Sequence, residues 1–142
     1  MTMLAINSTD ARNEWSAIVD SVVREKPRFI KRTRDYLMLS DIKLIELLLS
    51  AYTFTAKAFH ETDGSVTLSL NELDLVENGA DMDVALLKLA EGILEYAQDF
   101  YDDFAYWSTG HRKAHIPYVI KSLIINDIDK IGGLIQCQPG KN

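Results

Sequence analysis

Cysteine and long apolar runs are scarce in this sequence, and their scarcity excludes several kinds of protein. The single cysteine, Cys137, rules out an internal disulfide framework and a cysteine-based zinc site. The longest apolar runs, residues 42–49 and 119–125, are interrupted by charges and are too short to cross a bilayer. Residues 1–10 carry neither the cationic region nor the apolar region of a secretory signal. We therefore expect a protein of a reducing cytosol without membrane contact.

Constellations of residues that carry enzyme chemistry are also missing. The sequence has no glycine-rich phosphate loop, no nucleophile elbow and no credible Ser/His/Asp set. His111 and His115 have the four-residue spacing of metal ligands on a helix, but no glutamate completes the zincin pattern. Arg112 and Lys113 beside them would oppose a cation, so a surface pair at a helix start is the favoured interpretation. We expect no enzyme, no metal and no cofactor.

Other chemically distinctive residues have simple structural explanations. His60 is expected on the surface of a strand, and Cys137 is expected to be a buried small hydrophobe near the end of an apolar helix. Three acids of a predicted helix lie among tyrosines with no partnered base, which favours a solvated or partner-facing surface over a catalytic pair. These acids are Asp99, Asp102 and Asp103.

Charge is distributed unevenly along the 142 residues. A hydrophobic fraction of 47% and a charged fraction of 25% are typical of a globular protein. Residues 1–50 hold eight Lys/Arg and seven Asp/Glu, for a charge of +1, whereas residues 51–142 hold seven and fourteen, for −7. Residues 24–34 contain six basic residues and one acid. This segment is a local cationic patch, for which a plain solvated surface is the alternative explanation.

The first fifty residues predict a strand, a helix, two strands and a second helix. Residues 2–6 form an apolar strand that leads into a helix N-cap, and apolar residues at helical spacing continue to the break before Pro27. Residues 28–32 and 36–39 are strands joined by a tight polar turn. The second helix, from residue 40 to 52, is apolar over much of its circumference, so a second subunit is a natural packing partner.

The rest of the chain first predicts a β-hairpin. Residues 53–62 and 65–76 flank Asp63-Gly64, a strong signal for a two-residue turn. The alternation of the second strand slips at Asn71-Glu72, where we expect a bulge or bend, and Asn78-Gly79 punctuates the pattern.

Helices follow the predicted hairpin. The longest begins at Asp81 or Asp83, and two shorter helices have Pro117 in a first turn and Asp127 as a cap. Residues 138–142 are expected to fray. The fold class is α+β, with one domain at residues 1–52 and a β-hairpin/helical domain at residues 53–142.

Three segments of the first part resemble the Phd/YefM antitoxins, in the family's order and over about residues 3–52. Residues 6–20 resemble the opening strand and T-x-A-R-x-x-(apolar)-S helix start of the family. Residues 27–32 resemble its P-x-x-I-T-(K/R)-R strand, and residues 37–40 the strand before its second helix. The turn at residues 33–36 departs from the family because it is about two residues shorter. In the first segment the matching residues are Thr9, Ala11, Arg12, Ser16, Ile18 and Val19, with Trp15 where the family usually has leucine.

This resemblance implies a homodimer that binds operator DNA. A helix start offers free N–H groups to phosphate, and arginine and asparagine can read guanine and adenine edges. An intersubunit or surface ion pair is the alternative role for Arg12. The DNA-binding residues implied by position are Ser8, Thr9, Arg12, Asn13, Lys31, Arg32 and Arg34. The predicted dimer interface comprises Trp15, Ile18, Val22, Leu37, Leu39, Ile45 and Leu48.

The resemblance also implies a toxin as partner of the second part. In the family, the region after the DNA-binding module commonly folds onto a basic toxin such as a RelE/YoeB-type ribonuclease. Residues 53–142 are regularly patterned and are expected to fold by themselves, and residues 65–96 faintly resemble HicB-like antitoxin domains. Their charge of −7 would suit a cationic toxin, although acidic surfaces also serve solubility.

The leading hypothesis is a type II antitoxin that represses its own operator as a dimer and neutralises a co-encoded toxin. The second hypothesis is an orphan DNA-binding regulator or interaction module without a toxin. The third is an enzyme or small-molecule binder, which an apolar pocket with polar groups around Tyr96, Tyr101 and His111 would support.

Overall fold

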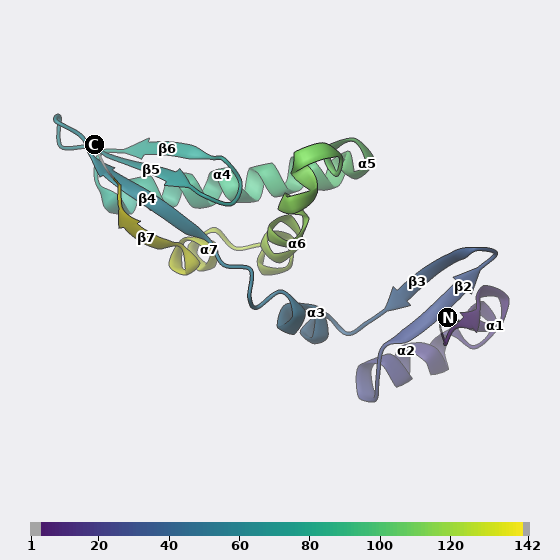
Figure 1. Cartoon of the computed structure of the whole chain (residues 1–142). Helices are drawn as coiled ribbons and strands as arrows, with labels where there is room; N and C mark the ends of the chain where they lie inside the picture. The colour runs from purple at the N-terminus through teal and green to yellow at the C-terminus, as the bar shows by residue number, and fades with distance from the viewer. Residues whose placement is uncertain (1–3, 141–142) are drawn as a thin grey trace. The chain divides into compact units, whose positions relative to one another are not determined.

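The computed structural model describes residues 4–140, which form two compact units (Figure 1). The N-terminal unit ends at Leu48 and the C-terminal unit begins at Leu49. The α+β class agrees with the prediction, and the predicted boundary after residue 52 falls between α3 (Ile42–Leu48) and β4 (Thr55–His60). In the described part of the chain, no helix combines the length and apolar character needed to span a bilayer.

The N-terminal unit has the predicted order of elements, with its first helix divided in two. β1 (Ile6–Asn7) leads into α1 (Ser8–Asn13), and α2 (Trp15–Arg24) follows after Glu14, whose φ of −114° and ψ of 28° are not helical. The side chain of Asn7 caps α1 by accepting a hydrogen bond from the Thr9 N–H at 2.8 Å. The predicted first strand also included residues 2 and 3, which lie outside the described residues.

A three-stranded sheet completes this unit. β2 (Arg28–Arg32) and β3 (Asp35–Leu39) form the predicted antiparallel hairpin, and β1 pairs in parallel with β2 on its other side. α3 ends at Leu48, four residues before the predicted end of the helix at Tyr52. The core of the unit is small: Ala11, Ile18 and Val22 are buried, with Ile6, Ile30 and Leu39 packed against them.

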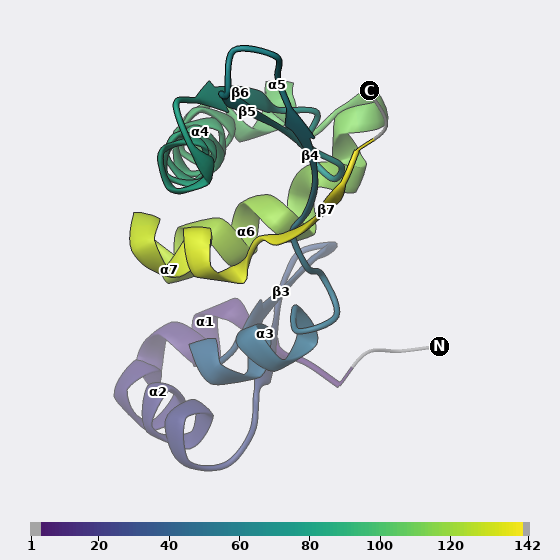
Figure 2. The ribbon, with the colours of Figure 1, turned by 90° about the vertical axis from the view of Figure 1, so that its left-hand side faces the viewer.

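The C-terminal unit contains a four-stranded sheet with the order β6-β5-β4-β7 (Figures 1 and 2). β4 and β5 (Val66–Leu70) form the predicted hairpin, but their last ladder pair is His60↔Val66, so the turn is wider than two residues. The bulge or bend expected at Asn71-Glu72 is a turn that covers residues 71–73. A second turn follows β5, and β6 (Val76–Gly79) folds back on it as a separate antiparallel strand. Asn78-Gly79, expected to punctuate the pattern, lies inside β6.

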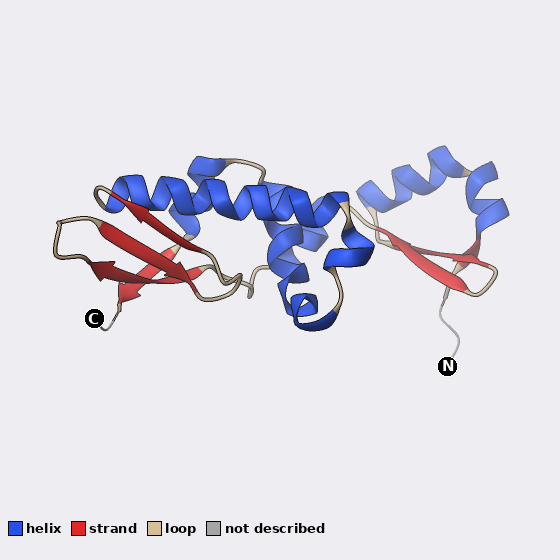
Figure 3. Ribbon diagram, turned by 90° about the horizontal axis from the view of Figure 1, so that it is seen from above, coloured by secondary structure: helices blue, strands red, loops and turns tan. Residues whose placement is uncertain are grey.

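The helices of this unit begin where capping residues predict. α4 (Met82–Asp102) runs along one face of the sheet (Figure 3), and the Asp81 carboxylate accepts from the Val84 N–H at 2.9 Å. α5 (Phe104–Trp107) and a 3₁₀ helix, η1 (Gly110–His115), precede α6 (Ile116–Ile125), whose first turn contains Pro117. Asp127 caps α7 (Ile128–Leu134) by accepting from the Lys130 N–H at 3.0 Å.

The end of the chain is ordered where fraying was expected. β7 (Gln136–Pro139) pairs in parallel with β4, from Thr55↔Gln136 to Ala58↔Pro139. The prediction of a frayed tail is therefore wrong for Gln138 and Pro139, and residues 141 and 142 lie outside the described part. Cys137 is exposed on this strand instead of buried in a helix, because residue 137 belongs to an edge strand.

Candidate functional site

The parallel pairing of β1 with β2 brings the two predicted DNA-binding segments of the N-terminal unit together. The register pairs Ile6 with Ile30 and Asn7 with Lys31, so the start of α1 emerges beside the end of β2. Residues that are more than twenty positions apart in the sequence thereby occupy the same end of the unit. The helix start contributes free N–H groups and the strand contributes cationic side chains, a combination suited to a phosphate backbone.

The cationic side chains at this end are exposed. Lys31, Arg32 and Arg34 are all exposed, with Arg34 in the two-residue turn that Arg32↔Asp35 closes. Thr33, the other turn residue, has a φ of 58°, which fits the tight turn predicted between the strands. The Lys31 ammonium lies 5.5 Å from the centre of the Tyr36 ring. This contact steadies the cation without neutralising it.

α1 presents the remaining predicted DNA contacts, with Ser8 and Thr9 at its start and Arg12 and Asn13 in its last turn. Thr9, Arg12 and Asn13 are exposed, and Ser8 is half-buried. Among the residues that the structure describes, no acidic side chain forms a salt bridge with Arg12. Arg12 and Ser8 line an open groove of about 470 Å³ together with Ala11, Trp15 and Ile30. These residues belong to α1, α2 and β2, so the groove lies where the three elements meet.

The residues predicted for the dimer interface fall into three groups by burial. Ile18 and Val22 are 3% and 7% exposed, because they form the core of their own unit. Leu39 and Ile45 are half-buried. Trp15, Leu37 and Leu48 are 50%, 55% and 59% exposed and are available to another chain.

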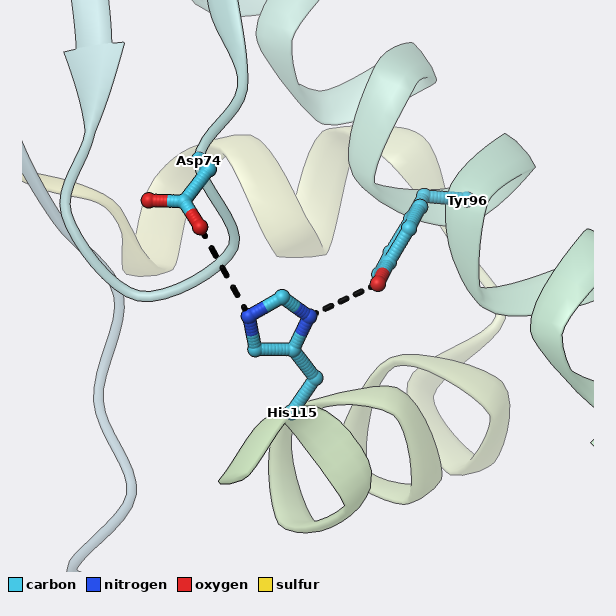
Figure 4. Close-up of polar contacts among 3 residues, drawn as sticks. All are labelled: Asp74, Tyr96 and His115. Carbon is cyan, nitrogen blue, oxygen red and sulfur yellow. Dashed lines mark hydrogen bonds and ion pairs between the residues drawn. The ribbon is translucent and has the colours of Figure 1, made fainter. Parts of the chain in front are cut away.

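In the C-terminal unit, the structure joins three polar side chains that the sequence did not connect (Figure 4). The Tyr96 hydroxyl lies 2.7 Å from His115 Nδ1, and His115 Nε2 lies 3.9 Å from the Asp74 carboxylate. Burial raises the pKa of the Tyr96 phenol, so this group stays protonated at neutral pH. Burial also lowers the pKa of His115, against the opposing effect of Asp74, and favours the neutral imidazole.

The geometry assigns a tautomer to this histidine. A carboxylate can only accept, so the proton of the neutral ring belongs on Nε2, facing Asp74. Nδ1 then accepts the hydrogen bond that the Tyr96 hydroxyl donates. The contacts link the turn before β6, the middle of α4 and the end of η1, and they serve to hold these three segments together.

The predicted surface pair of histidines is therefore wrong for one member. His111 is exposed, but His115 is 7% exposed and its ring centre lies 6.1 Å from that of His111. The sequence carries one signal for this burial, since His115 directly precedes the apolar segment of residues 116–125. Within the described residues, no group of three or more His, Cys, Asp or Glu side chains is arranged to hold a metal ion.

The other candidates of this unit lie on its surface. His60, Asp99, Asp102 and Asp103 are exposed, as expected. Tyr101 is 63% exposed, and the polar partner of Tyr96 is His115 instead of His111. In the part of the chain that the structure describes, Tyr96, Tyr101 and His111 do not converge on one polar site.

An aromatic cluster that the sequence did not predict lies at the end of α4. Ala97, Phe100 and Val119 are buried there against several aromatic rings. The guanidinium of Arg112 lies 4.7 Å from the Trp107 ring and 5.2 Å from the Tyr106 ring. Stacking of this kind covers the cluster and fixes η1 against α5.

Comparison with known proteins relates both units to antitoxins. A family model described as PHD_like, "Antitoxin of toxin-antitoxin, RelE / RelB, TA system", matches residues 1–137. A crystal structure from Syntrophomonas wolfei subsp. wolfei is similar, with a TM-score of 0.90 and 37% sequence identity. It is described as an antitoxin part of a proposed toxin/antitoxin system, and the match covers 97% of the present chain and 100% of the other. Among curated proteins, none matches.

Proposed function

Because this chain belongs to the PHD-like antitoxin family of RelE/RelB toxin–antitoxin systems, we propose that it is a Phd/YefM-type antitoxin that represses its own operator. In this proposal the N-terminal unit dimerises and binds DNA, and the acidic C-terminal unit binds the toxin. The protein acts by binding and has no catalytic role.

The observation that carries the DNA-binding proposal is the meeting of the α1 start with the end of β2. Exposed Arg12 lies on the helix side, and exposed Lys31 and Arg32 lie on the strand side. Phosphate contacts from the strand would position α1, whose Arg12 and Asn13, in its last turn, can address base edges. The acidic remainder of the molecule would oppose non-specific adhesion to DNA elsewhere on its surface.

Dimerisation is supported by the apolar surface of the same unit. β3 is an edge strand, and its Tyr36, Leu37 and Met38 are 43%, 55% and 44% exposed. α3 buries none of its residues within this chain. A free, apolar strand edge is a site for pairing with another chain, and a second copy would cover it.

The charge of the C-terminal unit supports a cationic toxin as its partner. Residues 51–142 carry a formal charge of −7, against +1 for residues 1–50. A ribonuclease of the RelE/YoeB type must bind an anionic RNA and is itself basic. An acidic unit would attract it over a distance and speed their encounter.

The experiment that tests the DNA-binding proposal is fluorescence anisotropy of the full chain with its own upstream DNA and with a scrambled duplex. The wild type is expected to prefer its own DNA and to bind more weakly as salt rises. Arg12→Ala is expected to weaken specific binding about tenfold, because a good base contact contributes about 1–3 kcal/mol. The double variant Lys31→Ala/Arg32→Ala is expected to reduce the slope of log K against log salt concentration by about two, because two fewer phosphate charges are neutralised.

The control is Lys57→Ala, which removes an exposed lysine of β4 in the other unit and is expected to leave DNA binding unchanged. Equal binding of both duplexes by the wild type at low and high salt would contradict the proposal. The unit would then serve chiefly to dimerise. Toxin binding is tested separately, by asking whether the chain protects cells from the product of the adjacent gene.

A further inference from the structure

An open apolar groove runs between the first half of α4 and α7 in the C-terminal unit, which Figure 2 shows side by side. Its volume is about 370 Å³. The apolar side chains that line it are Leu86, Leu87 and Ile128, and the backbone of Gly132 and Gly133 forms part of its wall. A space of this size holds one or two large side chains of another protein.

The two adjacent glycines of α7 keep the groove open at a cost to the helix. Glycine is one of the poorest helix formers, and α7 has only seven residues. The fold does not demand glycine here. A Cβ atom on Gly132 would make an ordinary contact of 3.7 Å with Ala90, and one on Gly133 would meet no atom within 4 Å. A local rule broken without a packing reason points to a function for the open space.

The rim of the groove is apolar and negatively charged. Leu87, which lines the groove, is 47% exposed. Asp83 and Asp129 line the groove from α4 and α7, and no lysine or arginine is among the lining residues. Lys88 is the nearest cation along α4, and its ammonium donates a hydrogen bond to the Asn78 carbonyl at 3.1 Å.

We propose that this groove is the docking site for an apolar and basic segment of the co-encoded toxin. An apolar side chain of the toxin enters the space beside Gly133, and a neighbouring lysine or arginine pairs with Asp83 or Asp129. This inference rests on the proposed function and names the surface that carries it out. A second copy of this chain fits poorly, since a unit with a formal charge of −7 over residues 51–142 repels its own kind.

The test measures binding of the full chain to the purified product of the adjacent gene, by isothermal titration calorimetry. Gly133→Trp fills the groove at a position where a side chain meets open space. Leu87→Asp places a charge on its apolar wall. Each is expected to raise Kd at least tenfold. Tyr101→Asp is the matched control, because Tyr101 is 63% exposed on the same helix and is not among the groove residues. It is expected to change Kd less than threefold.

A charge variant tests the second half of the proposal. Asp83→Asn/Asp129→Asn is expected to raise Kd three- to tenfold at low salt, and the difference from the wild type is expected to vanish near 0.5 M salt, where exposed pairs are screened. Thermal melting of each variant confirms that the unit is folded.

Each outcome separates the inference from the function on which it rests. If the wild type binds the adjacent gene product and both groove variants bind it equally well, the groove is not the docking site. If the wild type does not bind it and does not protect cells from it, the proposed toxin neutralisation itself fails. If Gly133→Trp changes the sedimentation of the chain alone but not toxin binding, the groove is a contact between copies and the proposal is overturned.

Discussion

The two units differ in how they use apolar residues, although they belong to one chain. Among the described residues, sixteen hydrophobic side chains are buried in the C-terminal unit and three in the N-terminal unit. The large exposed hydrophobic side chains are distributed the other way, with nine in the smaller N-terminal unit and seven in the larger C-terminal unit. The C-terminal unit therefore has a larger core, whereas the N-terminal unit leaves more of its large apolar side chains exposed, as the proposed dimer would require.

The largest expected effect breaks the core of the C-terminal unit. Leu68 lies in β5 with none of its surface exposed, so Leu68→Ala is expected to lower the free energy of unfolding by about 2–5 kcal/mol. Leu37→Ala in the other unit removes the same atoms from a side chain that is 55% exposed, and is expected to cost less than about 1 kcal/mol at low protein concentration. Urea denaturation measures both. Equal losses would mean that Leu37 is buried in solution, contrary to its 55% exposure in the single chain.

The next effect tests a close approach within the C-terminal unit. A Cβ atom on Gly79 of β6 would lie 2.3 Å from the Ala85 backbone nitrogen, so strand and helix would have to separate. Gly79→Ala is expected to cost about 1–3 kcal/mol of unfolding free energy. Gly92→Ala on α4 is the control, because its Cβ atom would meet the flexible Glu77 side chain at 3.4 Å, and alanine favours the helix. A neutral Gly79→Ala variant would show that β6 is free to move away from α4.

The third effect concerns the exposed edge strand of the N-terminal unit. Leu37→Asp places a charge on the exposed edge strand β3, and is expected to weaken self-association at least tenfold, or about 1.4 kcal/mol. Sedimentation equilibrium measures the dissociation constant, and melting of the C-terminal unit should be unchanged. Tyr106→Asp, at a tyrosine that is 62% exposed in the other unit, is the control. A wild type that is monomeric at all concentrations would contradict the dimer.

Residue periodicity and capping residues were sufficient to predict most of the elements of this fold. The carboxylates of Asp81 and Asp127 accept hydrogen bonds from backbone N–H groups in the first turns of the helices that they were predicted to cap. In β5, the alternation of apolar and polar residues matches the alternation of buried and half-buried side chains. The errors concern pairings between distant residues. The slip at Asn71-Glu72 predicted a bulge or bend without deciding between them, because a bulge and a tight turn give the same local pattern. The pairing of β7 with β4 joins residues about eighty positions apart, so no local signal marks it.

The same limit applies to the candidate site. Arg12 and Lys31 could each be singled out by residue type and position, but their common location depends on the pairing Asn7↔Lys31. His115 was expected on the surface because its neighbours Arg112 and Lys113 are charged. Its burial depends on Tyr96, which lies 19 residues earlier and donates a hydrogen bond that compensates the polar ring.

The smallest expected effect is the pH dependence that His115 gives to the C-terminal unit. Its pKa in the folded chain is lowered by burial below the ordinary value of 6.5, so the unfolded chain binds the proton more tightly. The stabilisation by the neutral ring is therefore fully present above pH 6.5 and is lost as the pH falls below that value. Melting temperatures between about pH 7.5 and pH 5 should decline more steeply for the wild type than for His115→Gln, which cannot take up the proton. If the melting temperatures of wild type and His115→Gln decline equally with pH, the His115 ring takes up its proton as readily in the folded unit as in the unfolded chain. The burial of the ring beside Tyr96 would then not lower its pKa.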